Sequence, residues 1–214
     1  MESLIKNVVF DLDGTLVNSN PASLRSLQHT MRIVENRYYT LNELEDVLGL
    51  SDDDVFKKMG ATKKSECYST WKALSKELDG DKKIFPSILE TLNQLRSFGI
   101  NLGIVTSRER ERYLDNHLIM TELDNYFNVI VTSEATVKHK PDPEPLLKWL
   151  ELSHSDPSQT IYIGDTKYDY ICAKKAGVRF GLAAWGLHQK VENELVFDDP
   201  IQIAQMFKRK GCLL

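Results

Sequence analysis

Residues 8–16 carry the sequence Val8-Val9-Phe10-Asp11-Leu12-Asp13-Gly14-Thr15-Leu16, in which an apolar run ends in two closely spaced aspartates. The apolar run predicts a buried β-strand over about residues 5–10. Two carboxylates held together at the end of a buried strand repel each other and lose their contact with water. A cation or a proton is needed to offset that cost. The segment therefore predicts a chemical role for Asp11 and Asp13, although Asp-Gly also occurs in ordinary turns.

The composition is that of a globular protein and excludes several functional classes. The 214 residues are 42% apolar and 27% charged, and they suffice for one large core, or for a core domain with a smaller one. The net charge of −4, without a long basic stripe, argues against a nucleic-acid partner. No apolar stretch approaches the roughly 20 residues of a membrane helix, and residues 1–6 lack a signal-peptide pattern. The three cysteines form no Cys-x-x-Cys pair, so we expect neither zinc nor disulfides, and we expect a cytoplasmic location.

Residues 17–84 show helical patterns only. Asn20-Pro21 predicts the N-cap and first residue of a helix, and Thr40-x-x-Glu43 forms a capping box for the next. Ser51 and Thr62 are the expected starts of two further helices. We therefore interpret 17–84 as an inserted helical domain.

From residue 85 onward, short apolar strands alternate with helices. Strands are expected at 101–105, 129–131, 160–163 and 180–183, with helices at 86–99 and 143–152 and another ending at Ala176. Such alternation is typical of a parallel sheet with helices on both faces. The predicted fold class is thus α/β: a Rossmann-like, doubly wound parallel-sheet core from 1–16 and 85–214, interrupted by the helical domain.

Polar side chains follow four of the predicted strands, at the edge where open parallel sheets bind ligands. In strand order they are Asp11 and Asp13, then Thr106 and Ser107, then Lys140, then Asp165 with Asp169 four residues later. Clustered acids suit Mg²⁺, while a hydroxyl and a lysine amine can bind phosphate oxygens. One aspartate could then attack phosphorus, giving an aspartyl-phosphate, while a second exchanges a proton with the leaving oxygen. The set predicts phosphoryl transfer.

These segments resemble the four ordered motifs of the haloacid dehalogenase superfamily: Asp11-Leu12-Asp13-Gly14-Thr15, the Thr106 strand end, Lys140-Pro141 and Gly164-Asp165-x-x-x-Asp169. The helical insert resembles the family's C1-type cap, so the likeness extends over nearly the whole chain. The resemblance implies a Rossmann-like core and a cap that closes over the site.

The same resemblance implies a role for each matching residue. Asp11 would be the nucleophile and Asp13 the general acid/base. Mg²⁺ would be held by Asp11, the backbone carbonyl of Asp13 and Asp165, with Asp169 near its water shell. Phosphate would be bound by Thr106, the Ser107 backbone amide and Lys140. A glycine at position 14 is also expected on physical grounds, because a chain that turns away beside a phosphate needs the space that a side chain would fill.

Two side-chain assignments remain open at this point. Lys138 competes with Lys140 for the phosphate site, and the adjoining proline favours Lys140. Arg108 could reach a second charged group of the substrate or could be an exposed arginine at a helix start. A third position departs from the family pattern. Asn18 stands where many relatives carry an acid, so the expected hinge to the helical domain and the expected contacts with the leaving group are less well defined by the resemblance.

The expected activity is hydrolysis of a small phosphorylated metabolite, a phosphate monoester, by a phosphoglycolate phosphatase-like enzyme that is a monomer or weak homodimer. The alternatives are a β-phosphoglucomutase-type transferase, a nucleotide or pyrophosphate hydrolase, and a non-catalytic binding module. The mutase is disfavoured because its relatives carry a histidine early in the first cap helix, where this chain has Pro21-Ala22-Ser23-Leu24. A dehalogenase would not need Asp13.

Overall fold

The core of the protein is a parallel sheet of six strands. The computed structural model describes residues 4–78, 82–115, 121–186, 191 and 195–209. The sheet order is β5-β4-β1-β6-β7-β8, and every neighbouring pair is parallel. The strands are β1 (Asn7–Phe10), β4 (Asn101–Val105), β5 (Val129–Val131), β6 (Thr160–Gly164), β7 (Arg179–Ala183) and β8 (Val196–Phe197). Counted along the chain this order is that of a doubly wound sheet, which confirms the predicted fold class.

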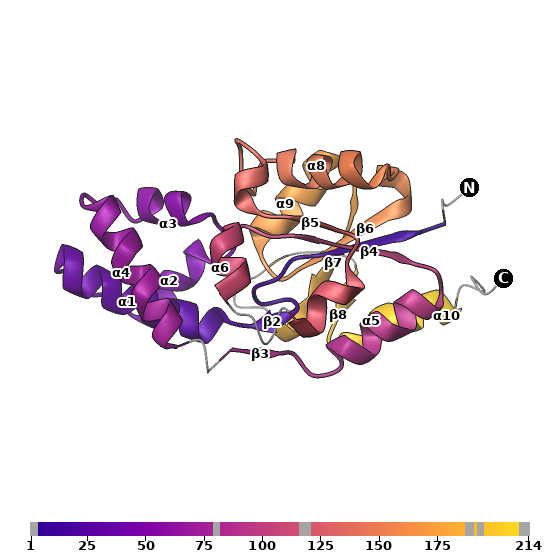
Figure 1. The fold of residues 1–214 in the computed structure, drawn as a ribbon, viewed down its shortest axis with the longest axis horizontal. Coiled ribbons are helices and arrows are strands. Elements are labelled where there is room, and N and C mark those ends of the chain that lie inside the picture. The colour runs from indigo at the N-terminus through magenta and orange to yellow at the C-terminus, as the bar shows by residue number, and fades with distance from the viewer. Residues whose placement is uncertain (1–3, 79–81, 116–120, 187–190, 192–194, 210–214) are drawn as a thin grey trace.

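Helices cover both faces of this sheet (Figure 1). The pair α8 (Glu144–Ser153) and α9 (Lys167–Ala176) lies on one face, and α5 (Ile88–Ser97) with α10 (Ile201–Arg209) lies on the other. Alternate residues of β1 point to opposite faces, so Val8 packs in the cluster that contains Leu92, while Val9 packs with Trp149. Because both faces are buried, the central strands contain continuous apolar runs, such as residues 8–10 of β1 and 102–105 of β4, as the sequence pattern indicated.

The remaining short elements connect these layers. They are α6 (Arg110–Asp115) and the 3₁₀ turns η3 (Asp124–Tyr126), η4 (Ser133–Ala135), η5 (Pro157–Gln159) and η6 (Ala184–Gly186). Cys67 and Cys172 are buried free thiols, and Cys212 lies outside the described residues. Within the described ranges, no helix combines the length and apolar character that crossing a bilayer requires.

A helical segment between β1 and β4 has a hydrophobic cluster of its own, which includes Leu27, Phe56 and Trp71. Figure 1 shows this segment beyond the carboxyl ends of the strands, on the side opposite to both termini. Its elements are α1 (Asn20–Glu35), α2 (Leu41–Leu44), η1 (Glu45–Val47), α3 (Asp52–Lys58) and α4 (Lys64–Glu77). The capping box of Thr40 and Glu43 and the N-cap Ser51 are confirmed. The assignment of 17–84 as a separate domain remains a prediction.

The entry to and exit from this segment differ from the sequence-based expectation. The strands β2 (Val17–Asn18) and β3 (Lys83–Ile84) pair antiparallel where only helices were expected. Two-residue strands are too short to show an alternating pattern, so the sequence carried no signal for them. Residues 79–81, just before β3, lie outside the described residues.

Two helix starts were also predicted wrongly. The N-cap of α1 is Ser19, so Asn20 is already helical and its side chain is available for another contact. The helix α4 begins at Lys64 because Thr62 instead binds the carboxylate of Glu35 through its backbone amide and hydroxyl, at 2.6 and 2.9 Å.

Candidate active site

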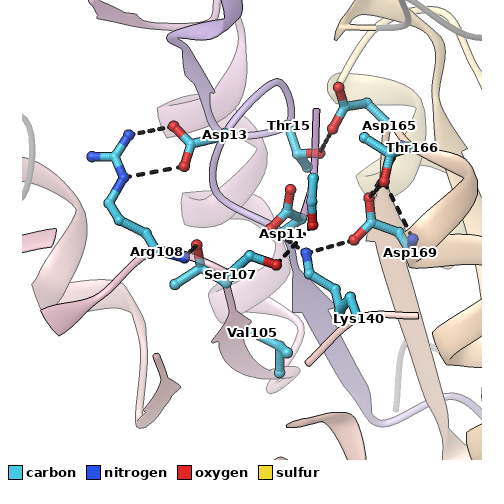
Figure 2. Close-up of polar contacts among 12 residues, drawn as sticks. Asp11, Asp13, Thr15, Val105, Ser107, Arg108, Lys140, Asp165, Thr166 and Asp169 are labelled. Carbon is cyan, nitrogen blue, oxygen red and sulfur yellow. Dashed lines mark hydrogen bonds and ion pairs between the residues drawn. The ribbon is translucent and has the colours of Figure 1, made fainter. Parts of the chain in front are cut away.

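Lys140 is the centre of a buried ionic cluster at the carboxyl ends of β1 and β6. Its amine donates hydrogen bonds to Asp11 Oδ1 at 2.8 Å and to Asp169 Oδ1 at 2.7 Å (Figure 2). All three side chains are at most 3% exposed. Lys138, the competing residue, is exposed, with its amine 3.7 Å from Asp142. The structure thus places Lys140, and not Lys138, among the acidic side chains.

Tyr162 adds a hydroxyl to this cluster that the sequence analysis missed. The side chain is fully buried in β6, and its hydroxyl lies 3.1 Å from Lys140 Nζ. The hydroxyl accepts from the ammonium and can donate to Asp169 Oδ1 at 2.9 Å or to the Val105 carbonyl oxygen at 3.0 Å. A tyrosine inside an apolar strand is typical of a core residue, and only its place just before Gly164-Asp165 pointed to the site. Tyr162 therefore connects Lys140 with the end of β4.

We expect Tyr162→Phe to lower kcat/KM about tenfold, because a hydrogen bond to a charged group contributes about 1.5–3 kcal/mol and part of this is regained by rearrangement. The phenylalanine ring keeps the packing against Phe180, so the fold should be preserved. Steady-state kinetics checks this result. Tyr170→Phe is the matched control, since Tyr170 packs on the same Phe180 ring from α9. An unchanged kcat/KM in Tyr162→Phe would contradict the positioning role.

Asp165 follows β6, and its carboxylate is held by two residues that follow β1 in the chain. Its two carboxylate oxygens accept hydrogen bonds from Thr15 Oγ1 and from Asn20 Nδ2, both at 3.2 Å. Asn20 had been expected only as a helix cap, so its contact with the site was missed. Gly14 has a φ of +79°, and a Cβ there would lie 2.1 Å from Asp165 Oδ2. The glycine is required here by the close approach of Asp165, in addition to any requirement for space beside a phosphate.

Asp169 has a second, structural contact besides those with Lys140 and Tyr162. It forms a capping box with Thr166 at the start of α9, in which Asp169 Oδ2 accepts from the Thr166 amide at 3.1 Å. The helix start thereby fixes the carboxylate toward the lysine.

Asp13 points away from the lysine cluster and binds Arg108 (Figure 2). Arg108 Nε lies 3.1 Å from Asp13 Oδ2, and Arg108 Nη2 binds Oδ1, so the contact is bidentate. Ser19 also donates its hydroxyl to Asp13 Oδ1. Burial alone would raise the pKa of Asp13, but the Arg108 guanidinium and Ser19 lower it to about 2. Arg108 is 5% exposed and lies in the site, so the interpretation of an exposed arginine was wrong.

Thr106 and Ser107 follow β4 and line a cavity that Asp11 and Lys140 also line. The Thr106 hydroxyl accepts a hydrogen bond from the Arg108 amide at 3.1 Å, which helps to place Arg108. The Ser107 hydroxyl donates to the Gly49 carbonyl oxygen at 2.8 Å and thus joins the core to the helical segment. Their binding of phosphate remains a prediction.

The cavity lies between the sheet edge and the helical segment. The wall from the helical segment is largely apolar and includes Leu24, Leu27 and Trp71. It also contains Asp52, whose two carboxylate oxygens both lie 2.7 Å from Arg112 Nη1. A small ligand in this space would contact charged groups at the sheet edge and an apolar wall opposite.

The donor set of the site suits a hard divalent cation. Asp11, Asp165 and Asp169 are buried, and each offers a carboxylate oxygen within 4.8 Å of the other two. Burial, opposed in part by Lys140, raises the pKa of Asp11 to about 7. Burial and the neighbouring acids raise the pKa of Asp165 well above its ordinary value. Three acids with one lysine leave uncompensated negative charge, and their all-oxygen donors match Mg²⁺.

Comparisons with known proteins agree with this geometry. A sequence profile of the family described as haloacid dehalogenase-like hydrolases matches residues 8–183. Pyrophosphatase PpaX from Bacillus mycoides is 32% identical over 184 residues, which are 86% of this chain and 85% of that protein. The structure of a presumed phosphoglycolate phosphatase from Lactobacillus plantarum is similar with a TM-score of 0.84 and 27% identity, covering 96% of this chain and all of that one. A hydrolase from Pseudomonas syringae shares the fold, with a TM-score of 0.85 and 19% identity over 95% of this chain and 98% of its own.

Proposed function

The chain belongs to the haloacid dehalogenase-like hydrolase family, and on this basis we propose that it is a Mg²⁺-dependent phosphatase acting on a small phosphorylated metabolite. The observation that carries the proposal is the Lys140 amine bound to Asp11, with Asp165 and Asp169 within reach of the same point. This arrangement puts a nucleophilic carboxylate, a phosphate-binding cation and an oxygen-rich metal site side by side.

The side chains divide the chemistry among them. An Asp11 oxygen attacks phosphorus, the bond to the leaving oxygen breaks, and water then hydrolyses the aspartyl-phosphate. Lys140 balances the negative charge of the phosphoryl oxygens. Asp13 gives a proton to the leaving oxygen and later takes one from the attacking water. This role requires that the contact with Arg108, which lowers the pKa of Asp13, is first broken.

The metal site is assigned from the same residues. Asp11, Asp165 and the backbone carbonyl of Asp13 are the proposed ligands of Mg²⁺, which when bound supplies positive charge to the phosphoryl oxygens. Asp169 is held by Lys140 and by the start of α9, and we assign it a supporting role beside the ion.

The helical segment is proposed to act as a cap. It supplies one wall of the cavity, so its closure would exclude water during phosphoryl transfer and select the leaving group. For the substrate, a phosphate monoester of the phosphoglycolate kind is the first candidate, and pyrophosphate is the second. The names of the similar proteins support both, and two arginines in the cavity wall suit an anionic compound.

Removal of divalent metal is expected to lower phosphatase activity at least about 100-fold, because the metal supplies several kcal/mol of charge stabilisation. The assay uses p-nitrophenyl phosphate and a panel of phosphorylated metabolites, with EDTA and then with added Mg²⁺. Thermal unfolding provides a second readout: Mg²⁺ should raise the Tm of the native protein and should raise that of Asp165→Asn much less. Undiminished activity in EDTA, or a panel without any turnover in Mg²⁺, would refute the proposed function.

A further inference from the structure

Arg108 is a buried cation in the cavity wall. Its side chain is 4% exposed, and it shares the cavity lining with Asp11 and Lys140. The residue stands just before α6, and the Thr106 hydroxyl anchors its backbone amide at 3.1 Å. The backbone of Arg108 is thus fixed beside the nucleophile, whereas the long side chain can change its partner by rotation.

Arg108 holds the residue to which we assign proton transfer. Both oxygens of Asp13 are engaged, Oδ2 by Arg108 Nε and Oδ1 by Arg108 Nη2 and Ser19. While this bidentate contact persists, Asp13 is turned toward the guanidinium and is not free to contact the leaving oxygen of a substrate. A productive complex therefore needs another partner for Arg108.

We propose that Arg108 is a specificity-determining residue that leaves Asp13 and binds an oxyanion on the leaving group, so that the enzyme selects substrates with a negatively charged leaving group. This inference rests on the proposed phosphatase function. The planar guanidinium fork matches a carboxylate or a phosphate, and either could replace Asp13 with the same two hydrogen bonds. A neutral leaving group offers no such replacement, so Arg108 would stay on Asp13.

Lys140 and Arg112, the other cations that line the cavity, are held by different sets of contacts. Lys140 is fully enclosed among Asp11, Asp169 and Tyr162 and faces the phosphoryl position. Arg112 binds both oxygens of Asp52 and lies 4.7 Å from the ring centre of Trp71, which adds a cation–π contact. The carboxylate of Asp13, by contrast, is 28% exposed, and both Asp13 and Arg108 line the cavity, so a ligand in the cavity can reach the contact between them. Arg108 is therefore the cation placed to exchange its partner for a ligand.

The test compares two pairs of substrates that differ in the charge of the leaving group. The pairs have matched alkyl leaving oxygens: phosphoglycolate with ethylene glycol monophosphate, and 1,3-propanediol bisphosphate with 1,3-propanediol monophosphate. For the native protein in Mg²⁺, kcat/KM should be at least about tenfold higher for the charged member of a pair, as expected for a charge-assisted bidentate contact.

Arg108→Gln should reduce this ratio to about one, because only the charged members lose a contact with the guanidinium, whatever the change in kcat/KM that both members share. Arg108→Lys should restore part of the ratio. Arg110→Gln is the matched control, because Arg110 is an exposed cation two residues away, and its ratio should equal that of the native protein.

A native enzyme that hydrolyses both members of each pair equally well would overturn the inference, as would an unchanged ratio in Arg108→Gln. Thermal unfolding of each variant shows whether the protein is folded. The ratio of the kcat/KM values of two substrates, measured on one variant, does not depend on the fraction of folded protein. Turnover of other members of the panel with none of these four compounds would overturn the inference alone, whereas absence of turnover of the whole panel in Mg²⁺ would refute the proposed function and the inference with it.

Discussion

Asp11→Asn is expected to lower kcat at least about 10³-fold on every phosphate substrate, because a neutral amide cannot form the acyl phosphate. The carboxylate of Asp11 is enclosed at 2% exposure, with the Lys140 amine 2.8 Å from Oδ1. Water cannot readily replace it as the attacking group in so enclosed a position. The measurement is kcat with p-nitrophenyl phosphate and with the best substrate of the panel.

The fold should survive this substitution. Burial raises the pKa of Asp11 to about 7, so its ionised form is costly in the absence of metal, and an amide keeps an oxygen that can accept from Lys140. Thermal unfolding should therefore show no large loss of Tm without metal. Asp53→Asn is the matched control, since Asp53 is an exposed aspartate in the first turn of α3, and its kcat should equal the native value. Residual activity of Asp11→Asn within tenfold of native would mean that another group attacks phosphorus.

Lys140→Met is expected to lower the free energy of unfolding in EDTA by about 3–5 kcal/mol, the range for removing one partner of a buried ion pair. Burial alone would lower the pKa of Lys140, but Asp11 and Asp169 raise it well above its usual value, so the amine is charged in the native protein. Methionine has a similar length but no charge and no donor. It would leave Asp11 and Asp169 facing each other without a cation. Urea unfolding at neutral pH measures the loss.

Two observations make this result specific. Lys148→Met, at a half-buried lysine in α8 that pairs with Glu151, should change the free energy of unfolding by less than about 1 kcal/mol. Added Mg²⁺ should return part of the stability of Lys140→Met, because the ion compensates the same acids. Stability within about 1 kcal/mol of native in EDTA would show that the acids do not depend on Lys140.

The layout of the core could be predicted from the sequence because its signals are local. Continuous apolar runs such as residues 102–105, separated by helical segments, indicate buried parallel strands. Parallel strands present their carboxyl ends at one edge, so Asp11, Lys140 and Asp165 could be expected to meet. Helix starts with their own side-chain contacts, such as Ser51 and Thr40, were also visible.

The contacts within the site could not be predicted, because they depend on side chains that approach each other from distant elements. Nothing local to Arg108 shows that its guanidinium turns back to Asp13, 95 residues earlier. Tyr162 and Asn20 were missed for the same reason, since each is typical of its own strand or helix start. Their roles follow only from the packing of β6 against β1 and from the entry of the chain into α1.

The proposed reaction requires that Asp11 is phosphorylated at the point where Lys140 and Asp165 meet. The most direct measurement is to quench the enzyme in acid during turnover of its best substrate with Mg²⁺, and to locate the phosphoryl group by peptide mass spectrometry. We predict a phosphoryl group on the peptide that contains Asp11 in the native protein and none there in Asp11→Asn. Steady turnover without any phosphorylated peptide, or with the phosphoryl group on another residue, would contradict the account.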